Sequence, residues 1–171
     1  LAHFKEVLGI ELNVFAGGHE RDNLHYEVIN TTSQEKFGLI HKILESEIKD
    51  SEGGAIVFAA KRKSAEDIAA FLKEMGWSCA YFHAGLQPDE KKDVQQNFIN
   101  GDLHVIVATN AFGMGVDKPD VRAVIHAEIP GSLENYLQEA GRAGRDRNES
   151  RCILLYDEND VEVQFGLAAR S

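Results

Sequence analysis

The segment that decides the fold is Ala55-Ile56-Val57-Phe58-Ala59-Ala60-Lys61-Arg62-Lys63, a short apolar run that ends abruptly in three cations. Similar apolar runs, each followed by polar or glycine-rich residues, recur at Val105–Ala108, Ala123–Ile125 and Ile153–Tyr156. These runs are continuously apolar rather than alternating, which is typical of parallel strands covered by helices on both faces. The sequence therefore predicts a parallel sheet assembled from βαβ units.

Two further strands and four helices complete the predicted pattern. Cys79–Phe82 is a shorter apolar run, and Leu24–Ile29 alternates in the way expected of an edge strand. Helical spacing predicts helices at Ser33–Lys49, Ser64–Met75, Gln87–Ile99 and from Ser132 onward. Ser64 with Asp67 three residues on predicts a capped start for the second helix, and Gly76 predicts its end. The expected fold class is α/β, with a largely parallel central sheet and helices on both faces.

The length of 171 residues suits one domain. We expect residues 1–22 to be a linker or the tail of a preceding domain, and residues 23–171 to be the domain itself. Because the first residue is not Met, we expect the chain to be a piece of a longer protein.

Composition narrows the classes of function. The 18 Lys and Arg against 28 Asp and Glu give a formal charge of −10, which argues against tight, autonomous binding to nucleic acid. Two cysteines cannot make a four-cysteine metal site or a disulfide scaffold. The sequence contains neither a signal peptide nor an apolar run of membrane length. We expect an intracellular protein, in a cytoplasm, nucleoid or nucleus, with no membrane partner.

Polar and glycine-rich segments follow four of the predicted strands. They are Lys61–Lys63, His83–Gly85, Thr109–Gly115 and Glu128–Gly131. In an open parallel sheet, ligands bind beyond the carboxyl ends of the strands, and glycines allow a backbone to approach a phosphate closely. Each segment taken alone also fits an ordinary turn or a solvated surface, and a lone His83 fits a satisfied polar residue. Together they favour a functional site along the carboxyl ends of the strands.

Two arginines form a second candidate site. If the helix from Ser132 continues far enough, Gln138, Arg142 and Arg145 project from one side of it. Guanidinium groups deliver fixed charge and forked donors to phosphoryl oxygens, as an arginine finger does in phosphoryl transfer. The alternative is a surface arginine pair that offsets nearby carboxylates.

Four segments in sequence order resemble the motifs of one family. Ala108–Arg122 resembles motif V of RecQ-family DNA helicases, which belong to superfamily 2, and Gln138–Asp146 resembles their motif VI. Tyr81–Leu86 is similar to motif IVa, and Ile56–Arg62 to motif IV. The resemblance runs from about residue 23 to residue 160. The phrase Ala-Phe-Gly-Met-Gly combined with Gly-Arg-Ala-Gly-Arg-Asp separates RecQ-like chains from most RNA helicases.

The resemblance implies the second RecA-like domain of a two-domain DNA motor. ATP and Mg²⁺ would be held mainly by an N-terminal RecA-like domain of the same protein, and this chain would face them across a cleft. Arg142, Arg145 and Gln138 would take the catalytic positions, with Arg145 first in line for the γ-phosphate. The ATP-binding positions would be Gly115 and Asp117 together with the two arginines.

The resemblance also implies a path for DNA, with single strands running across both halves and duplex DNA unwound 3′ to 5′. Arg62, Gly85, Thr109 and Asn110 match positions expected near the DNA backbone, where contacts are largely blind to sequence. Lys61 departs from the family, which commonly has a small hydroxyl residue there. The zinc-binding subdomain usual in the family needs four cysteines, so we expect no zinc in this chain.

Two sequence motifs of a complete motor are missing from these 171 residues. There is neither a Gly-x-x-x-x-Gly-Lys-Ser/Thr phosphate loop nor an Asp-Glu-x-His motif for Mg²⁺ and the attacking water. An arginine finger stabilises charge in a transition state that other residues assemble, so we expect the chain alone to be inactive. Two alternatives remain, namely half of an RNA helicase motor and a non-catalytic nucleic-acid-binding module.

Overall fold

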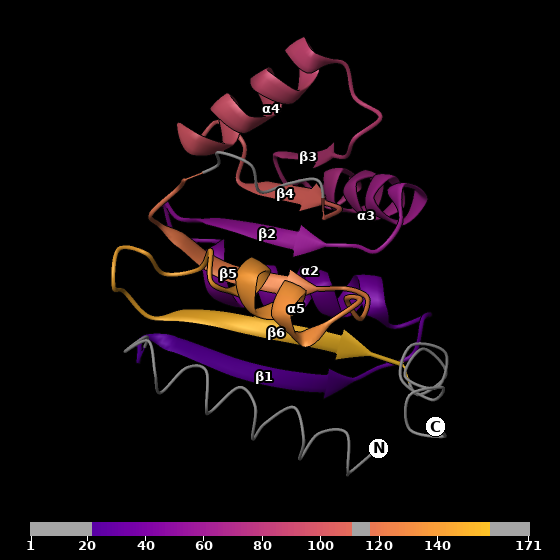
Figure 1. Ribbon diagram of the computed structural model, residues 1–171, viewed down its shortest axis with the longest axis vertical. Coiled ribbons are helices and arrows are strands. Elements are labelled where there is room, and N and C mark those ends of the chain that lie inside the picture. Colours follow the sequence, from indigo (N-terminus) through magenta and orange to yellow (C-terminus); the bar gives the residue numbers. More distant parts are fainter. Residues whose placement is uncertain (1–21, 111–116, 158–171) are drawn as a thin grey trace.

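Six parallel strands form one sheet in the computed structural model, which describes residues 22–110 and 117–157. The strands lie in the order β1-β6-β5-β2-β4-β3 (Figure 1). Their bounds are β1 (Leu24–Asn30), β2 (Gly54–Phe58), β3 (Cys79–Phe82), β4 (Val105–Ala108), β5 (Val121–His126) and β6 (Ser150–Tyr156). Every pairing is parallel, so the predicted sheet and the edge position of β1 are confirmed.

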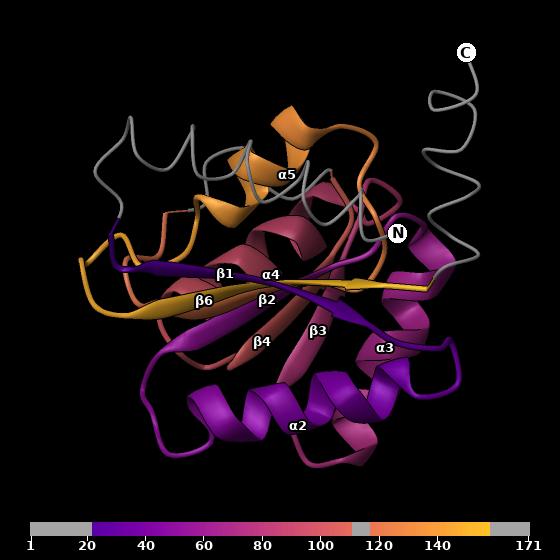
Figure 2. The ribbon, with the colours of Figure 1, turned by 90° about the horizontal axis from the view of Figure 1, so that it is seen from below.

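Helices cover both faces of this sheet, as predicted. They are α2 (Lys36–Ile48), α3 (Arg62–Glu74), α4 (Pro88–Ile99) and α5 (Leu133–Ala140). In Figure 2, α2 and α3 lie on one side of the sheet and α5 lies on the other. Apolar residues of α4 and α5 belong to the core on the α5 side, and those of α2 and α3 to the opposite core.

The central strands supply both cores because neighbouring residues of a strand point to opposite faces. Ile56 and Ile106 pack under α4 and α5, whereas Val57 and Val107 pack under α2 and α3. All four are at most 1% exposed. This two-sided burial explains why the strand sequences are apolar without alternation.

The positions of the helix ends determine where polar side chains reach the surface. Ser132 caps α5 by accepting a hydrogen bond from Asn135 N, and Pro88 occupies the first turn of α4, as predicted. The predicted cap at Ser64 is wrong, because α3 begins at Arg62 directly after an extended Lys61. The helix starts as soon as the chain leaves the sheet, and this brings Arg62 to the sheet's edge.

Helix α5 is shorter than the arginine hypothesis requires. It ends at Ala140, and Gly141 is its C-cap. Arg142 and Arg145 therefore lie on the turns that follow, and the expectation that they share one helical face with Gln138 is wrong. The chain reverses at Gly144, whose φ of +58° is in the left-handed region.

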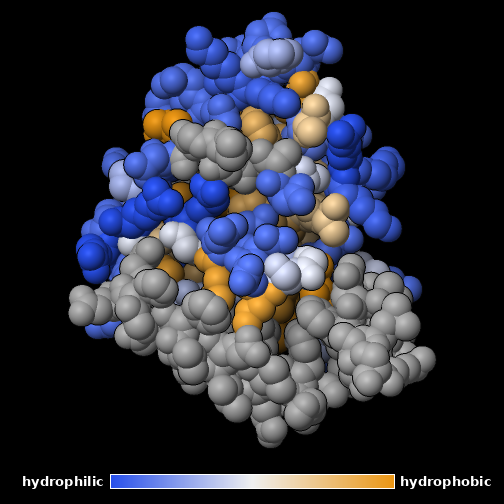
Figure 3. Space-filling model, in the orientation of Figure 1, coloured by the Kyte–Doolittle hydropathy of each residue, from blue (hydrophilic) through white to orange (hydrophobic). Residues whose placement is uncertain are grey.

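The two edges of the sheet carry different segments. Strand β4 ends at Ala108 on the carboxyl edge, and β5 begins at Val121 on the amino edge, because the two strands run in the same direction. Thr109 and Asn110 thus belong to one edge and residues 117–120 to the other. In the view of Figure 3, hydrophilic side chains dominate over α3 and α4, and apolar side chains reach the surface beside α5.

Truncating a central strand residue should destabilise the fold far more than truncating an exposed residue of the same type. Ile106 is fully buried in β4, so Ile106→Ala should lower the free energy of unfolding by about 2–5 kcal/mol. Ile99 is 38% exposed at the end of α4, and Ile99→Ala should cost about 1 kcal/mol or less. Urea denaturation of both variants measures the difference, and equal losses would contradict the core described here.

Candidate functional site

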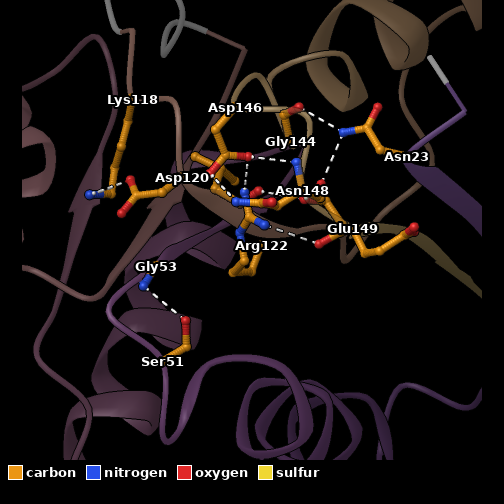
Figure 4. Close-up of polar contacts among 12 residues, drawn as sticks. Asn23, Ser51, Gly53, Lys118, Asp120, Arg122, Gly144, Asp146, Asn148 and Glu149 are labelled. Atoms are coloured by element: carbon orange, nitrogen blue, oxygen red, sulfur yellow. Dashed lines mark hydrogen bonds and ion pairs between the residues drawn. The ribbon is translucent and has the colours of Figure 1, made fainter. Parts of the chain in front are cut away.

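A partly buried ion pair anchors the loop that follows α5. Arg122 on β5 contacts Asp146, with 2.5 Å between Nη2 and Oδ1 (Figure 4). Its other terminal nitrogen donates to the carbonyl of Glu149 at 3.2 Å. Asp146 also accepts from the backbone N–H of Asn148 at 3.0 Å, and its own N–H donates to the carbonyl of Pro119 at 3.0 Å. The loop is therefore tied to the amino edge of the sheet.

The charge state of Asp146 follows from these contacts. Burial favours the neutral acid, but hydrogen bonds from Asn148 and Arg122, together with the positive charge of Arg122, outweigh it. The net effect lowers the pKa of Asp146 below its usual value. Asp146 is thus a carboxylate at neutral pH and holds Arg122 in place.

Asn23 fastens the same loop from the side of β1. Its side-chain nitrogen donates to the carbonyl of Gly144 at 2.7 Å and to that of Asn148 at 2.9 Å. Ser150 donates its hydroxyl to the carbonyl of Val121 at 3.0 Å. A Cβ on Gly144 would lie 2.5 Å from the Asn23 nitrogen and 2.9 Å from the Ser150 hydroxyl. Gly144 is required here both for its backbone conformation and for lack of space.

This anchored loop presents Arg145 to solvent. The Arg145 guanidinium lies 2.9 Å from the Asp117 carboxylate, and the two side chains are 43% and 74% exposed. Asp117 arrives from the segment before β5, so the structure brings together two residues that are 28 positions apart. Gln138 is exposed on α5. Gly115 lies outside the described residues.

Arg142 is half-buried beside Arg145. Burial lowers the pKa of the Arg142 guanidinium, and the positive charge of Arg145 lowers it further, while Glu139 acts in the opposite direction. An arginine nevertheless keeps its charge at neutral pH. The positive charge beside the Arg142 guanidinium would be offset by an incoming anion.

The other predicted residues meet at the carboxyl edge. Arg62 at the start of α3 lies against Gly85, because a Cβ on Gly85 would be 3.2 Å from Arg62 Nη1. The Thr109 N–H donates to the carbonyl of Phe82 at 3.2 Å, which places Thr109 beside the loop that holds Gly85. Arg62 and Gly85 are exposed, whereas Thr109 is buried.

Asn110 faces a different feature of this edge, a cavity of about 240 Å³ between β2, β5 and α5. His126 lines the cavity, is 1% exposed, stacks on Phe58 and lies 3.0 Å from the Glu139 carboxylate. Burial lowers the pKa of His126, against the opposing effect of Glu139. Glu128 at the cavity's rim accepts a hydrogen bond from the Ala60 N–H at 2.9 Å.

With these two edges defined, the chain was compared with known proteins. Residues 35–147 match the family described as the helicase conserved C-terminal domain. The chain belongs to this family. The structural neighbours agree, since the chain superposes on the Escherichia coli DEAD-box protein SrmB with a TM-score of 0.70 and 25% identity, covering 85% of this chain and 83% of that one. Saccharomyces cerevisiae Dbp5 has the same fold, with a TM-score of 0.73 at 22% identity over 88% of this chain and 41% of the other.

Sequence relatives identify the branch of this family as RecQ-type. The ATP-dependent DNA helicase RecQ of Bacillus subtilis is 40% identical over 93% of this chain, which spans 26% of that protein. The ATP-dependent helicase SGS1 of S. cerevisiae is 44% identical over 84% of the chain, and the RecQ-like DNA helicase BLM of Xenopus laevis 41% identical over 86%. The chain spans 10% and 11% of these two proteins. The RecQ resemblance and the RecA-like fold are thus confirmed.

Within residues 22–110 and 117–157, no three His, Cys, Asp or Glu side chains gather as a metal site. None of the helices that the structure describes is both long and apolar enough to cross a bilayer.

Sequence reasoning missed the residues that support the arginines. The pairing of Arg122 with Asp146 and the double hydrogen bond of Asn23 join positions 24 and 121 or more residues apart, so no local spacing could have identified them. The pairing of His83 with Glu66 was missed for the same reason. Only Gly144, a glycine between two arginines, gave a local signal of a tight turn.

The crowding around Gly144 predicts a large penalty for a methyl group. Gly144→Ala should lower the free energy of unfolding by about 3 kcal/mol, because it adds left-handed strain of 1–2 kcal/mol to the loss of the Asn23 hydrogen bonds. Gly76 has a φ of +97° with nothing within 4 Å of its Cβ position. Gly76→Ala therefore adds backbone strain without a steric clash, and it should lower the free energy of unfolding by about 1 kcal/mol. Thermal and urea denaturation compare the two, and an equal loss would show that Asn23 does not hold the loop.

Proposed function

We propose that the chain is the second motor domain of an ATP-dependent DNA helicase that moves 3′ to 5′ along single-stranded DNA. Residues 23–171 would form this domain, and residues 1–22 would connect it to an N-terminal RecA-like domain of the same protein. That domain would hold ATP and Mg²⁺, and this chain would complete the site. The names of the RecQ, SGS1 and BLM relatives, all helicases, support the proposal.

The observation that carries the proposal is the exposed Arg145 on an anchored loop. A partly exposed guanidinium on an anchored loop can meet a phosphate held by another domain with little reorganisation, and the phosphate would share or replace the Asp117 carboxylate as its partner. Arg142 lies next to it, and the unfavourable effect of Arg145 on the Arg142 charge would fall when a polyphosphate arrives. We assign Arg145 to the γ-phosphate and Arg142 to the negative charge of the polyphosphate beside it. Gln138 would position the nucleotide. Asp117 and Gly115 would lie toward the ribose.

The carboxyl edge would track the DNA backbone. Arg62 supplies a cation, and no described carboxylate lies within ion-pair distance of it. Gly85, Thr109 and Asn110 lie at the ends of neighbouring strands, where a chain of phosphates could pass. Because the whole chain carries a charge of −10, most of the positive surface would come from other parts of the protein. Zinc has no role in this chain under the proposal, and the protein would work inside the cell.

DNA is proposed over RNA because the RecQ and BLM relatives are named as DNA helicases. A comparison of ATP hydrolysis stimulated by DNA and by RNA separates the two substrates. The third possibility, a non-catalytic binding module, requires that the protein lack a phosphate loop outside this chain.

Removing the Arg145 guanidinium should abolish most ATP hydrolysis. In the intact, DNA-stimulated protein, Arg145→Ala should lower kcat by about 10³-fold, the scale on which arginine fingers act. Arg145→Lys should rescue little, since a lysine lacks the forked donors. Steady-state ATPase assays measure both variants.

The matched control for this experiment is Arg147→Gly. Arg147 is exposed two residues further on and has a φ of +72°, which a glycine adopts freely. Its replacement removes the same charge and should leave kcat within about twofold. The purified 171-residue chain should not hydrolyse ATP, and turnover by it that survives Arg145→Ala would refute the assignment.

The salt dependence of DNA binding tests the proposed contact at the carboxyl edge of the sheet. Arg62→Ala in the intact protein should reduce the slope of log K against log salt by about 0.7 for oligo-dT, the contribution of one phosphate contact on a single strand. Lys63→Ala removes an equal charge from the same turn, but Lys63 already pairs with Asp67 at 2.8 Å, so the slope should change less. Fluorescence anisotropy at several salt concentrations gives both slopes, and identical slopes would contradict a specific role for Arg62.

A further inference from the structure

The loop after β3 is organised around one buried histidine. His83, whose side chain is 8% exposed, has its Nε2 atom 2.8 Å from the Glu66 carboxylate on α3. Its Nδ1 atom accepts a hydrogen bond from the backbone N–H of Gly85 at 3.0 Å. Tyr81 stacks on the ring at 5.2 Å between centroids. The imidazole thus joins a helix to the turn that follows a strand.

These contacts determine which nitrogen carries the proton. An amide N–H can donate only to a nitrogen with a free lone pair, so the Nδ1 atom of His83 is unprotonated. The proton is then on Nε2, which donates it to Glu66. The contacts therefore require a neutral imidazole with Nε2 protonated.

The Gly85 turn that His83 holds lies beside Arg62. The Cβ position of Gly85 is 2.9 Å from His83 Cε1 and 3.2 Å from Arg62 Nη1, so the ring and the guanidinium both border the bare face of the glycine. Arg62 itself is exposed. The hydrogen bond of the Gly85 N–H to His83 also means that this N–H does not point to solvent. The exposed donor beside this loop is therefore the Arg62 guanidinium at the start of α3, rather than a free backbone N–H of the loop.

We propose that His83 is a positioning residue whose neutral imidazole holds the Gly85 turn and Arg62 in the arrangement that receives a nucleic-acid phosphate. The inference rests on the proposed function, because it assumes that Arg62 contacts the backbone of DNA. It adds that this contact is sensitive to pH through His83.

Protonation of His83 would undo this arrangement. Glu66 accepts from Nε2 in either state, so the contact that is lost is the one between Nδ1 and the Gly85 N–H, where two donors would oppose each other. The charged or titratable groups that the described structure places in contact with the ring are Glu66 from α3 and Tyr81 from β3, and Arg62 from α3 lies across Gly85 from it. A cationic ring would also repel the Arg62 guanidinium. The turn would then shift, and Arg62 with it.

Two substitutions separate the nitrogens of the ring. His83→Asn keeps an acceptor near the position of Nδ1 and does not titrate, whereas His83→Gln keeps a donor near Nε2 but offers Gly85 no acceptor. Binding of fluorescent oligo-dT by the intact protein is measured at constant salt at pH 8 and pH 6, a range in which histidines change charge. Wild type should bind about 10-fold more weakly at pH 6, the scale of one hydrogen bond. His83→Asn should bind more tightly than His83→Gln at pH 8 and show no added loss at pH 6, and His83→Gln should be weak at both.

Nuclear magnetic resonance of ¹⁵N-histidine-labelled protein tests the geometry without any substitution. At pH 8 the His83 signals should report a proton on Nε2 and none on Nδ1, and the opposite tautomer would overturn the inference. Wild-type binding that is equal at both pH values, or a pH-dependent loss that persists in His83→Asn, would also overturn it. Absence of oligo-dT binding by wild type at pH 8 would overturn the proposed function and this inference with it.

Discussion

The common direction of the strands is the constraint on which the two candidate sites depend. Since every strand runs the same way, each connection must carry the chain from the carboxyl edge back to the amino edge. The segment between β4 and β5 makes this return, and it therefore has Thr109 and Asn110 at one edge and Asp117 at the other. A strand of five or six residues separates the edges by about 17–20 Å. One sequence motif thus contributes to both the proposed DNA path and the proposed nucleotide site.

Each edge is held by a polar arrangement in addition to the apolar cores. At the amino edge, Arg122 and Asp146 fasten the turn that carries Arg145. At the carboxyl edge, His83 links α3 to the turn beside Arg62. A loop anchored by hydrogen bonds at several points presents a guanidinium in a defined place, which is what recognition of a phosphate requires.

Much of the fold was predictable from local pattern. Apolar runs without alternation predicted buried parallel strands, and Pro88, Ser132 and Gly76 marked helix ends correctly, because strand burial and helix capping depend on residues close in sequence. The cap at Ser64 was wrong because the end of β2, and not the best capping residue, determined where α3 begins. The assumption of one helical face for the arginines failed because α5 ends at Ala140 and the chain turns at Gly144.

The sequence by itself determined the α/β class, the strands and the residue types of both sites, since these follow from periodicity and from motifs of adjacent residues. Only the tertiary structure decided which groups meet: Arg145 with Asp117, Asn23 with Gly144, and His83 with Glu66. The physical reason is that hydrogen bonds and ion pairs depend on distances of about 3 Å between atoms. Such distances between residues far apart in the chain are set by how the sheet and helices pack.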